Sequence, residues 1–117
     1  MNLSHHIILR IESFLIFLSS IFFYHQFNMS WQFFFVIFFI PDISMLAYFI
    51  NKKIGALFYN LTHNYIFPII LLILFYDNTL LLSLALIWIT HIGFDRMLGF
   101  GLKSTQGFYY THLMLAP

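Results

Sequence analysis

The chain has 117 residues, of which 62% are hydrophobic and only 8% are charged, and its formal net charge is +1. Soluble domains carry about 25% charged residues, so this composition excludes a water-soluble globular protein and makes the lipid bilayer the natural surroundings of most of the surface. The small net charge argues against a nucleic-acid-binding surface, which needs clustered Lys and Arg. The absence of cysteine excludes disulfides and thiolate metal sites.

Four apolar runs of membrane-spanning length follow one another along the chain. They predict helices at about residues 11–27, 31–50, 54–76 and 79–98, separated by short polar loops. The first run contains Glu12 and has no small-residue cleavage site, so we expect a retained span and not a signal peptide. The runs also lack the alternation of polar and apolar residues that is typical of barrel strands.

Helices that are joined by such short loops pack as antiparallel neighbours. The predicted fold is therefore an all-α membrane protein with one transmembrane domain over residues 1–117, built as a four-helix antiparallel transmembrane bundle. Residues 108–115 are amphipathic. We expect them to form a short C-terminal tail that lies at the membrane interface or folds back under the bundle.

The basic residues predict the orientation of this bundle. In an up-and-down arrangement all of them fall on the same side of the membrane: Arg10, Lys52, Lys53, Arg96 and Lys103. Cytoplasmic loops carry an excess of Lys and Arg. The sequence therefore predicts that this side of the bundle, together with both termini, is cytoplasmic.

Three ionisable side chains on different predicted helices fall at nearly the same depth in the membrane. Counted at 1.5 Å per residue, Asp42, His63 and His91 lie roughly 10–14 Å from the cytoplasmic ends of their helices. Ionisable groups inside a membrane are costly, so they mark functional sites by default. Two histidines and a carboxylate suit a divalent metal such as Zn, Mn or non-haem Fe, and His112 in the tail could complete the ligand shell from below.

Further polar residues surround this level. Asp95 follows His91 by four residues, so its carboxylate can orient the imidazole or share a ligand with it. Tyr59 and Asn60 belong to a polar stripe on the third helix. The remaining candidate polar residues are Glu12, Arg96 and Lys103.

Two prolines lie beside members of this group. Pro41 and Pro68 each lack the N–H that would bond the carbonyl four residues back, so we expect both to kink their helices. The kinks lie near Asp42 and His63 and would free backbone acceptors there, which a membrane tolerates only where protein or water satisfies them.

The same residues also fit a purely structural interpretation. A single histidine inside a membrane is more often a hydrogen-bonding partner between helices than a metal ligand. Asp95 beside Arg96, with Glu12 and Arg10 at the same depth, can form ion pairs near the interface. The first functional hypothesis is therefore a binding or structural membrane component whose polar core serves packing.

Two other functions remain open. In a metal-dependent intramembrane hydrolase with a lipid-like substrate, Asp42, His63 and His91 would hold the metal. Asp95 would then orient His91, while Arg96 or Lys103 would meet an anionic headgroup. In a proton- or ion-coupled carrier the same side chains would line the path, and four helices would need a homo-oligomer to form one.

Several short motifs together point to a known family. They are Arg10-Ile-Glu12, Pro41-Asp42-Ile-Ser44-Met45-Leu46, Tyr59-Asn60-Leu-Thr-His63, Trp88-Ile-Thr-His91-Ile-Gly93-Phe-Asp95-Arg96, Gly99-Phe-Gly101-Leu-Lys103, Gly107-Phe108 and Thr111-His112-Leu113. In this combination the sequence resembles domain-of-unknown-function family 4260 over nearly its whole length. The resemblance implies a small bacterial multi-pass protein of the inner (plasma) membrane, and it implies no particular activity.

Overall fold

The structure, a computed structural model, describes residues 3–104 and 107–111. Its elements in chain order are α1 (Leu3–Gln26), α2 (Trp31–Ile37), the 3₁₀-helix η1 (Ile40–Phe49), α3 (Lys52–Thr62), α4 (Ile66–Leu74), α5 (Thr79–Met97) and the strands β1 (Lys103–Ser104) and β2 (Gly107–Thr111). Four helical segments are long and apolar enough to cross a membrane, namely His5–Gln26, Trp31–Phe49, Lys52–Leu74 and Thr79–Met97. The predicted class, a helical membrane-spanning protein, is confirmed.

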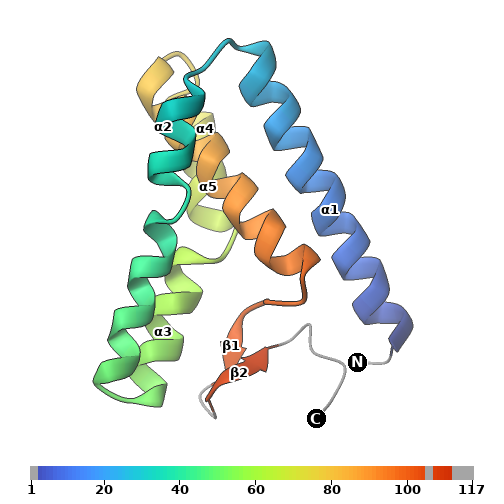
Figure 1. Cartoon of the computed structure of the whole chain (residues 1–117), viewed down its shortest axis with the longest axis vertical. Coiled ribbons are helices and arrows are strands. Elements are labelled where there is room, and N and C mark those ends of the chain that lie inside the picture. The colour runs from blue at the N-terminus through green and yellow to red at the C-terminus, as the bar shows by residue number, and fades with distance from the viewer. Residues whose placement is uncertain (1–2, 105–106, 112–117) are drawn as a thin grey trace.

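Figure 1 shows how the helices are arranged. The chain rises along α1, descends through α2 and η1, rises again through α3 and α4, and descends along α5. Helix α5 packs against α1 on one side and against α4 and α2 on the other, while η1 pairs with α3. Helix α5 is the most buried of the four spans, so polar side chains on α5 are the best shielded from lipid.

The second predicted helix is interrupted between α2 and η1. Pro41 has no N–H to donate to an α-helical ladder, and the Asp42 N–H bonds the carbonyl of Phe39, three residues back, at 3.1 Å. The chain therefore continues as a 3₁₀-helix from Ile40. A 3₁₀ stretch inside a helical span often marks a functional site or strain, and here it begins beside a predicted site residue.

The third predicted helix is interrupted between α3 and α4. Asn64 makes the break: its Nδ2 donates to the Asn60 carbonyl at 2.8 Å, and its Oδ1 accepts the Ile66 N–H at 2.9 Å. Such side-chain bonds compete with the helical ladder. Pro68 then falls in the first turn of α4, where its missing N–H costs little. Where the sequence predicted kinks, the structure has complete interruptions.

The end of the chain also differs from the sequence expectation. Residues 107–111 form β2, which pairs antiparallel with β1 so that Lys103 lies opposite Thr111. The two strands contact α3 (Figure 1). A search for apolar runs does not detect strands this short, although Tyr109 and Tyr110 are residue types that favour them. The rest of the expected tail, residues 112–115, lies outside the described residues.

Helices α1 and α5 lie in close backbone contact at Gly93. A Cβ on Gly93 would lie 3.1 Å from the backbone nitrogen of Phe17 and 3.1 Å from the carbonyl oxygen of Ser13, so α1 leaves no room for a side chain. One turn away, the buried hydroxyl of Thr90 donates to Ser20 Oγ at 2.7 Å. Small residues and hydroxyl bonds of this kind stabilise helix pairs in membranes.

Thr90→Val removes this interhelical bond and keeps the shape of the side chain. We expect the free energy of unfolding in detergent micelles to fall by about 0.6–1.7 kcal/mol, the range for hydrogen bonds between membrane helices. The matched control is Thr79→Val, at an exposed position of the same helix, which should leave stability unchanged. Equal stability of Thr90→Val and wild type would contradict the role given to the bond.

Candidate metal centre

Four side chains from three elements converge on one point. Asp42 lies in the first turn of η1, His63 ends α3, and His91 and Asp95 lie one turn apart on α5. One ligand atom from each lies within 4.8 Å of those of the other three, close enough to hold a metal ion. We call these four residues the His/Asp cluster. Both helix interruptions occur directly beside one of its members, so the breaks in the ladder help to position it.

The distances within the His/Asp cluster are nearly equal. The Nε2 atoms of His63 and His91 are 3.2 Å apart. Oδ1 of Asp42 lies 3.2 Å from the first of these atoms and 3.1 Å from the second. Oδ2 of Asp95 lies 3.4 and 3.2 Å from the same two atoms. A regular tetrahedron of ligands with bonds of about 2.0–2.1 Å, as around Zn²⁺, has edges of about 3.3–3.4 Å. These five separations therefore have the lengths of tetrahedral edges, and the ligand atoms of Asp42 and Asp95 lie within 4.8 Å of each other.

Burial differs among the four members. The side chains of His63 and His91 are 2% and 1% exposed, and that of Asp95 is 16% exposed. The side chain of Asp42 is 32% exposed. The cluster therefore has a closed side, formed by α3 and α5, and an open side at Asp42.

Hydrogen-bond partners behind the His63 imidazole fix the direction of its Nε2 atom, whereas the buried Nδ1 of His91 has no hydrogen-bond partner among the described residues. Nδ1 of His63 lies 2.9 Å from the Tyr59 carbonyl oxygen and 2.8 Å from Thr62 Oγ1. A proton on that Nδ1, donated to the carbonyl, leaves a lone pair on Nε2 that faces the cluster. The His63 ring also stacks on the Tyr59 ring at 3.7 Å between centroids. Phe38 meets the His91 ring edge-on at 4.9 Å.

Arg96 lies beside the cluster but does not pair with Asp95. Its Nη2 donates to the His63 carbonyl at 3.3 Å, and its guanidinium lies over the Tyr65 ring, 4.6 Å from the centroid. The interruption after His63 takes this carbonyl out of the helical ladder, so Arg96 supplies the donor that a membrane environment does not. Since Asp95 points to the histidines, the expected ion pair between Asp95 and Arg96 is not what the structure shows.

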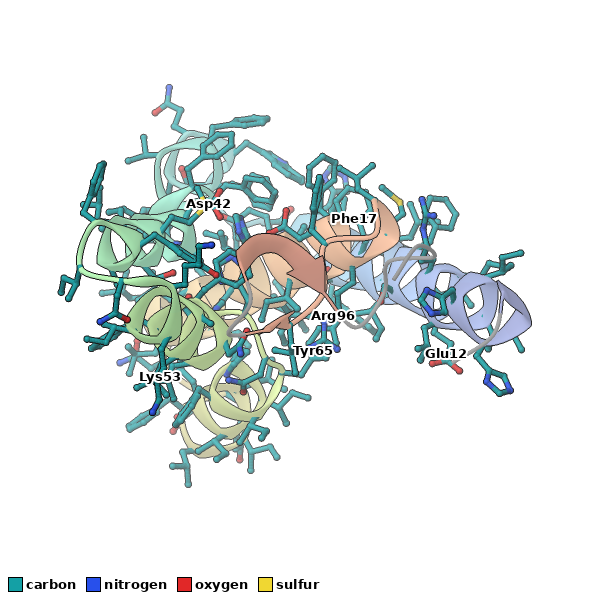
Figure 2. The ribbon with its side chains drawn as sticks, turned by 90° about the horizontal axis from the view of Figure 1, so that it is seen from below. Glu12, Phe17, Asp42, Lys53, Tyr65 and Arg96 are labelled. Carbon is teal, nitrogen blue, oxygen red and sulfur yellow. The ribbon has the colours of Figure 1, made fainter. Side chains whose placement is uncertain are left out.

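Among the described side chains, Glu12, Arg10 and Asn60 are not members of the His/Asp cluster. Glu12 is exposed on the outer part of α1, away from Asp42 (Figure 2), and Arg10 donates to the Met97 carbonyl at 3.0 Å. The carbonyl of Asn60 accepts the hydrogen bond from Asn64 Nδ2 at the break between α3 and α4. Lys103 belongs to β1, where only the backbone is described, and His112 lies outside the described residues.

Sequence reasoning left the role of Asp95 open between orienting His91 and sharing a ligand with it. In the structure the carboxylate lies on the Nε2 side of both rings, where it is a potential ligand itself, and the i,i+4 spacing was the signal for this. Sequence reasoning passed over Thr62, whose hydroxyl contacts Nδ1 of His63 and whose only signal is its place next to that histidine.

A family model matches residues 6–115, a range that contains the entire His/Asp cluster. The chain belongs to the family described as Domain of unknown function (DUF4260). The family resemblance seen in the motifs is therefore confirmed over nearly the whole chain. Comparisons of this DUF4260 chain with curated proteins and with solved structures find no match.

Proposed function

We propose that this chain is a membrane metalloprotein that binds one divalent ion between the four residues of the His/Asp cluster. The observation that carries the proposal is the set of five near-equal separations, 3.1 to 3.4 Å, between each imidazole Nε2 atom and the other ligand atoms. A tetrahedron with edges of this length would place an ion about 2 Å from each atom, which is a normal bond length to nitrogen or oxygen.

Two protonation states of a cluster without metal conflict with these positions. If both imidazoles carry their proton on Nδ1, two lone pairs face two carboxylate oxygens with no proton between them. If both rings are fully protonated, two cationic N–H groups of His63 and His91 lie 3.2 Å apart. A dication removes both conflicts, because it accepts all four lone pairs and its charge cancels that of the two carboxylates.

The ligand types favour a borderline transition metal. Imidazole nitrogens suit Zn, Fe and Cu, and carboxylates suit harder ions such as Mn. Among these, Zn²⁺ is the ion that most regularly takes four protein ligands in a tetrahedron. We therefore place Zn²⁺ first, with Mn and Fe as the alternatives.

The open side of the cluster favours a metal-dependent hydrolase as the activity. Catalytic zinc sites keep one position for water or substrate, whereas structural sites are closed by protein ligands. Asp42 is the most exposed member and lies on a short 3₁₀-helix beside a proline. It is therefore the ligand that can yield its position to a substrate, while His63, His91 and Asp95 hold the ion that polarises the scissile bond.

We infer that both chain ends face the cytoplasm. The start of α1 and the turn between η1 and α3 lie at the same end of the molecule in Figure 1, and α5 runs toward that end. These are the places where the basic residues gather, as the positive-inside rule requires.

The metal content of the purified protein tests the proposal. Protein purified without a histidine tag and exposed to Zn²⁺ should contain about one equivalent of metal, and the His63→Ala/His91→Ala variant should contain none. The matched controls are His25→Ala and Asp77→Asn, which change the same residue types at exposed positions outside the cluster, and both should keep the metal. A folded wild-type protein that retains no Zn²⁺, Mn²⁺ or Fe²⁺ would overturn it.

A further inference from the structure

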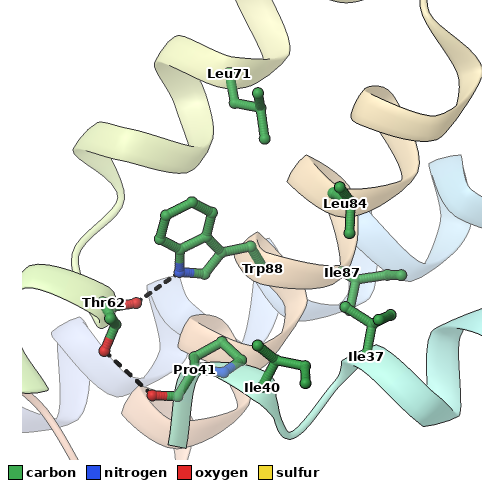
Figure 3. A pocket seen from close by; sticks show the side chains of 8 residues that line it. All are labelled: Ile37, Ile40, Pro41, Thr62, Leu71, Leu84, Ile87 and Trp88. Atoms are coloured by element: carbon green, nitrogen blue, oxygen red, sulfur yellow. Dashed lines mark hydrogen bonds between the residues drawn. The ribbon is translucent and has the colours of Figure 1, made fainter. Parts of the chain in front are cut away.

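A cavity of about 330 Å³ lies next to the His/Asp cluster. Residues from three of the four spans line it, namely from α2 and η1, from α3 and α4, and from α5 (Figure 3). We call it the Trp88 pocket, and its lining residues are Ile37, Ile40, Pro41, Thr62, Leu71, Leu84, Ile87 and Trp88. Its size falls within the range of small-molecule sites in proteins.

The polar atoms at the wall of the Trp88 pocket are already engaged. The Trp88 indole Nε1 donates to the Thr62 carbonyl at 2.6 Å, and the Thr62 hydroxyl lies 3.3 Å from the Pro41 carbonyl (Figure 3). The same hydroxyl lies 2.9 Å from Ser44 Oγ. A water molecule in a cavity needs two to four polar partners. This cavity has the volume of roughly ten waters but offers them almost no partners, so it suits an apolar occupant.

The wall of the pocket includes both exposed and buried side chains. Ile40 is 48% exposed, while Ile87 is 1% exposed. Both residues belong to segments that are long and apolar enough to cross a membrane, so the medium outside the exposed part of the wall is expected to be lipid hydrocarbon. An apolar chain can therefore enter from the side without crossing water.

The pocket and the His/Asp cluster share their supports. Pro41 directly precedes Asp42, and Thr62 directly precedes His63 and contacts its Nδ1. On α5, Ile87 and Trp88 lie one turn before His91. Thus η1, α3 and α5 each carry a potential metal ligand within the element or at its end. Each also carries a residue that lines the pocket, within one helical turn of that ligand.

We propose that the Trp88 pocket binds one hydrocarbon chain of a membrane lipid, and that the polar end of the same lipid lies at the His/Asp cluster beside Pro41. The occupant follows from the apolar wall, the opening toward the hydrocarbon layer and the shared supports. The first half of the proposal stands on the pocket alone. The second half rests on the proposed metal centre and names the substrate class, a lipid, for that centre.

Quenching of Trp88 fluorescence by a brominated chain tests the first half, because bromine quenches an indole on contact. The chain has two tryptophans, so a Trp31→Phe background isolates Trp88. Titration of the detergent-solubilised protein with terminally bromine-labelled dodecanoic acid should give saturable quenching. Leu84→Phe fills the pocket and should weaken binding about tenfold, the cost of roughly one misplaced hydrophobic group. Leu80→Phe, one turn earlier on α5 and exposed, should bind as the background does.

Comparison of metal-loaded and chelator-treated protein tests the second half. Metal should tighten binding of the brominated acid severalfold and leave binding of brominated dodecane, which has no polar end, unchanged. Quenching that does not saturate, or that is the same in the Leu84→Phe variant as in the background protein, would refute binding of a hydrocarbon chain in the pocket. Equal affinity for the acid with and without bound metal would refute the placement of its polar end. Metal content measured on the same samples reports separately on the metal centre, so failure of the two proposals can be told apart.

Discussion

His91→Ala should weaken Zn²⁺ binding by more than about a hundredfold, because loss of a supporting residue alone costs ten- to a hundredfold at metal sites. His91 is buried, and its Nε2 atom lies 3.1 to 3.2 Å from the ligand atoms of His63, Asp42 and Asp95. No water can take its place without entering the packed space between α5 and Phe38. Competition titration against a zinc indicator measures the change.

Asp42→Asn should weaken binding much less than His91→Ala. The Asp42 side chain is one-third exposed, so water or a weaker amide ligand can complete the shell from the open side. His25→Ala serves as the control for loss of a histidine outside the cluster, and its affinity should match that of the wild type. Equal losses for Asp42→Asn and His91→Ala would contradict the distinction between an open and a closed side.

Gly93→Leu should separate α1 from α5 and cause the largest loss of stability of any single substitution considered for this chain. Overpacking a well-packed interior costs about 1–3 kcal/mol and occasionally more. Here the upper end applies, because the new side chain meets backbone atoms of Ser13 and Phe17 that have no rotamer to change. Thermal unfolding in detergent, followed by circular dichroism, measures the effect.

Ser19→Leu is the matched control for this variant. It adds the same side chain to the α1 surface at an exposed position, and it should leave the unfolding temperature near that of the wild type. A Gly93→Leu protein with the same unfolding temperature as the wild type would show that α1 is not held against α5 at this point. Since α5 supplies His91 and Asp95, the zinc affinity of Gly93→Leu should fall together with its stability.

The depth of each ionisable side chain in the membrane could be predicted from the sequence, whereas the side of the helix that faces the other helices could not. A fixed rise per residue placed Asp42, His63 and His91 at one level before any fold was known, and the structure brings these three together. Glu12 had the same ionisable character, yet it faces outward from α1. The difference depends on which face each helix turns to its neighbours, and a nearly uniform apolar sequence carries little information about that.

The helix interruptions were only half predictable. Proline chemistry located them near residues 41 and 68, but proline alone predicts a kink. The complete break at residues 63–65 depends on Asn64, whose amide bonds both flanking turns. That break turns the His63 carbonyl toward Arg96, so the role of Arg96 could not be inferred from spacing. The strands β1 and β2 escaped prediction because they are short.

The order in which the ligands occur along the chain has a consequence for biosynthesis. Asp42 and His63 emerge from the ribosome before α4, whereas His91 and Asp95 belong to the last span. A nascent chain that ends before Thr79 therefore offers an ion only one carboxylate and one imidazole of the His/Asp cluster. At the proposed metal centre, tight capture of metal would have to wait until α5 has entered the bilayer, and a bound ion would then mark completed insertion.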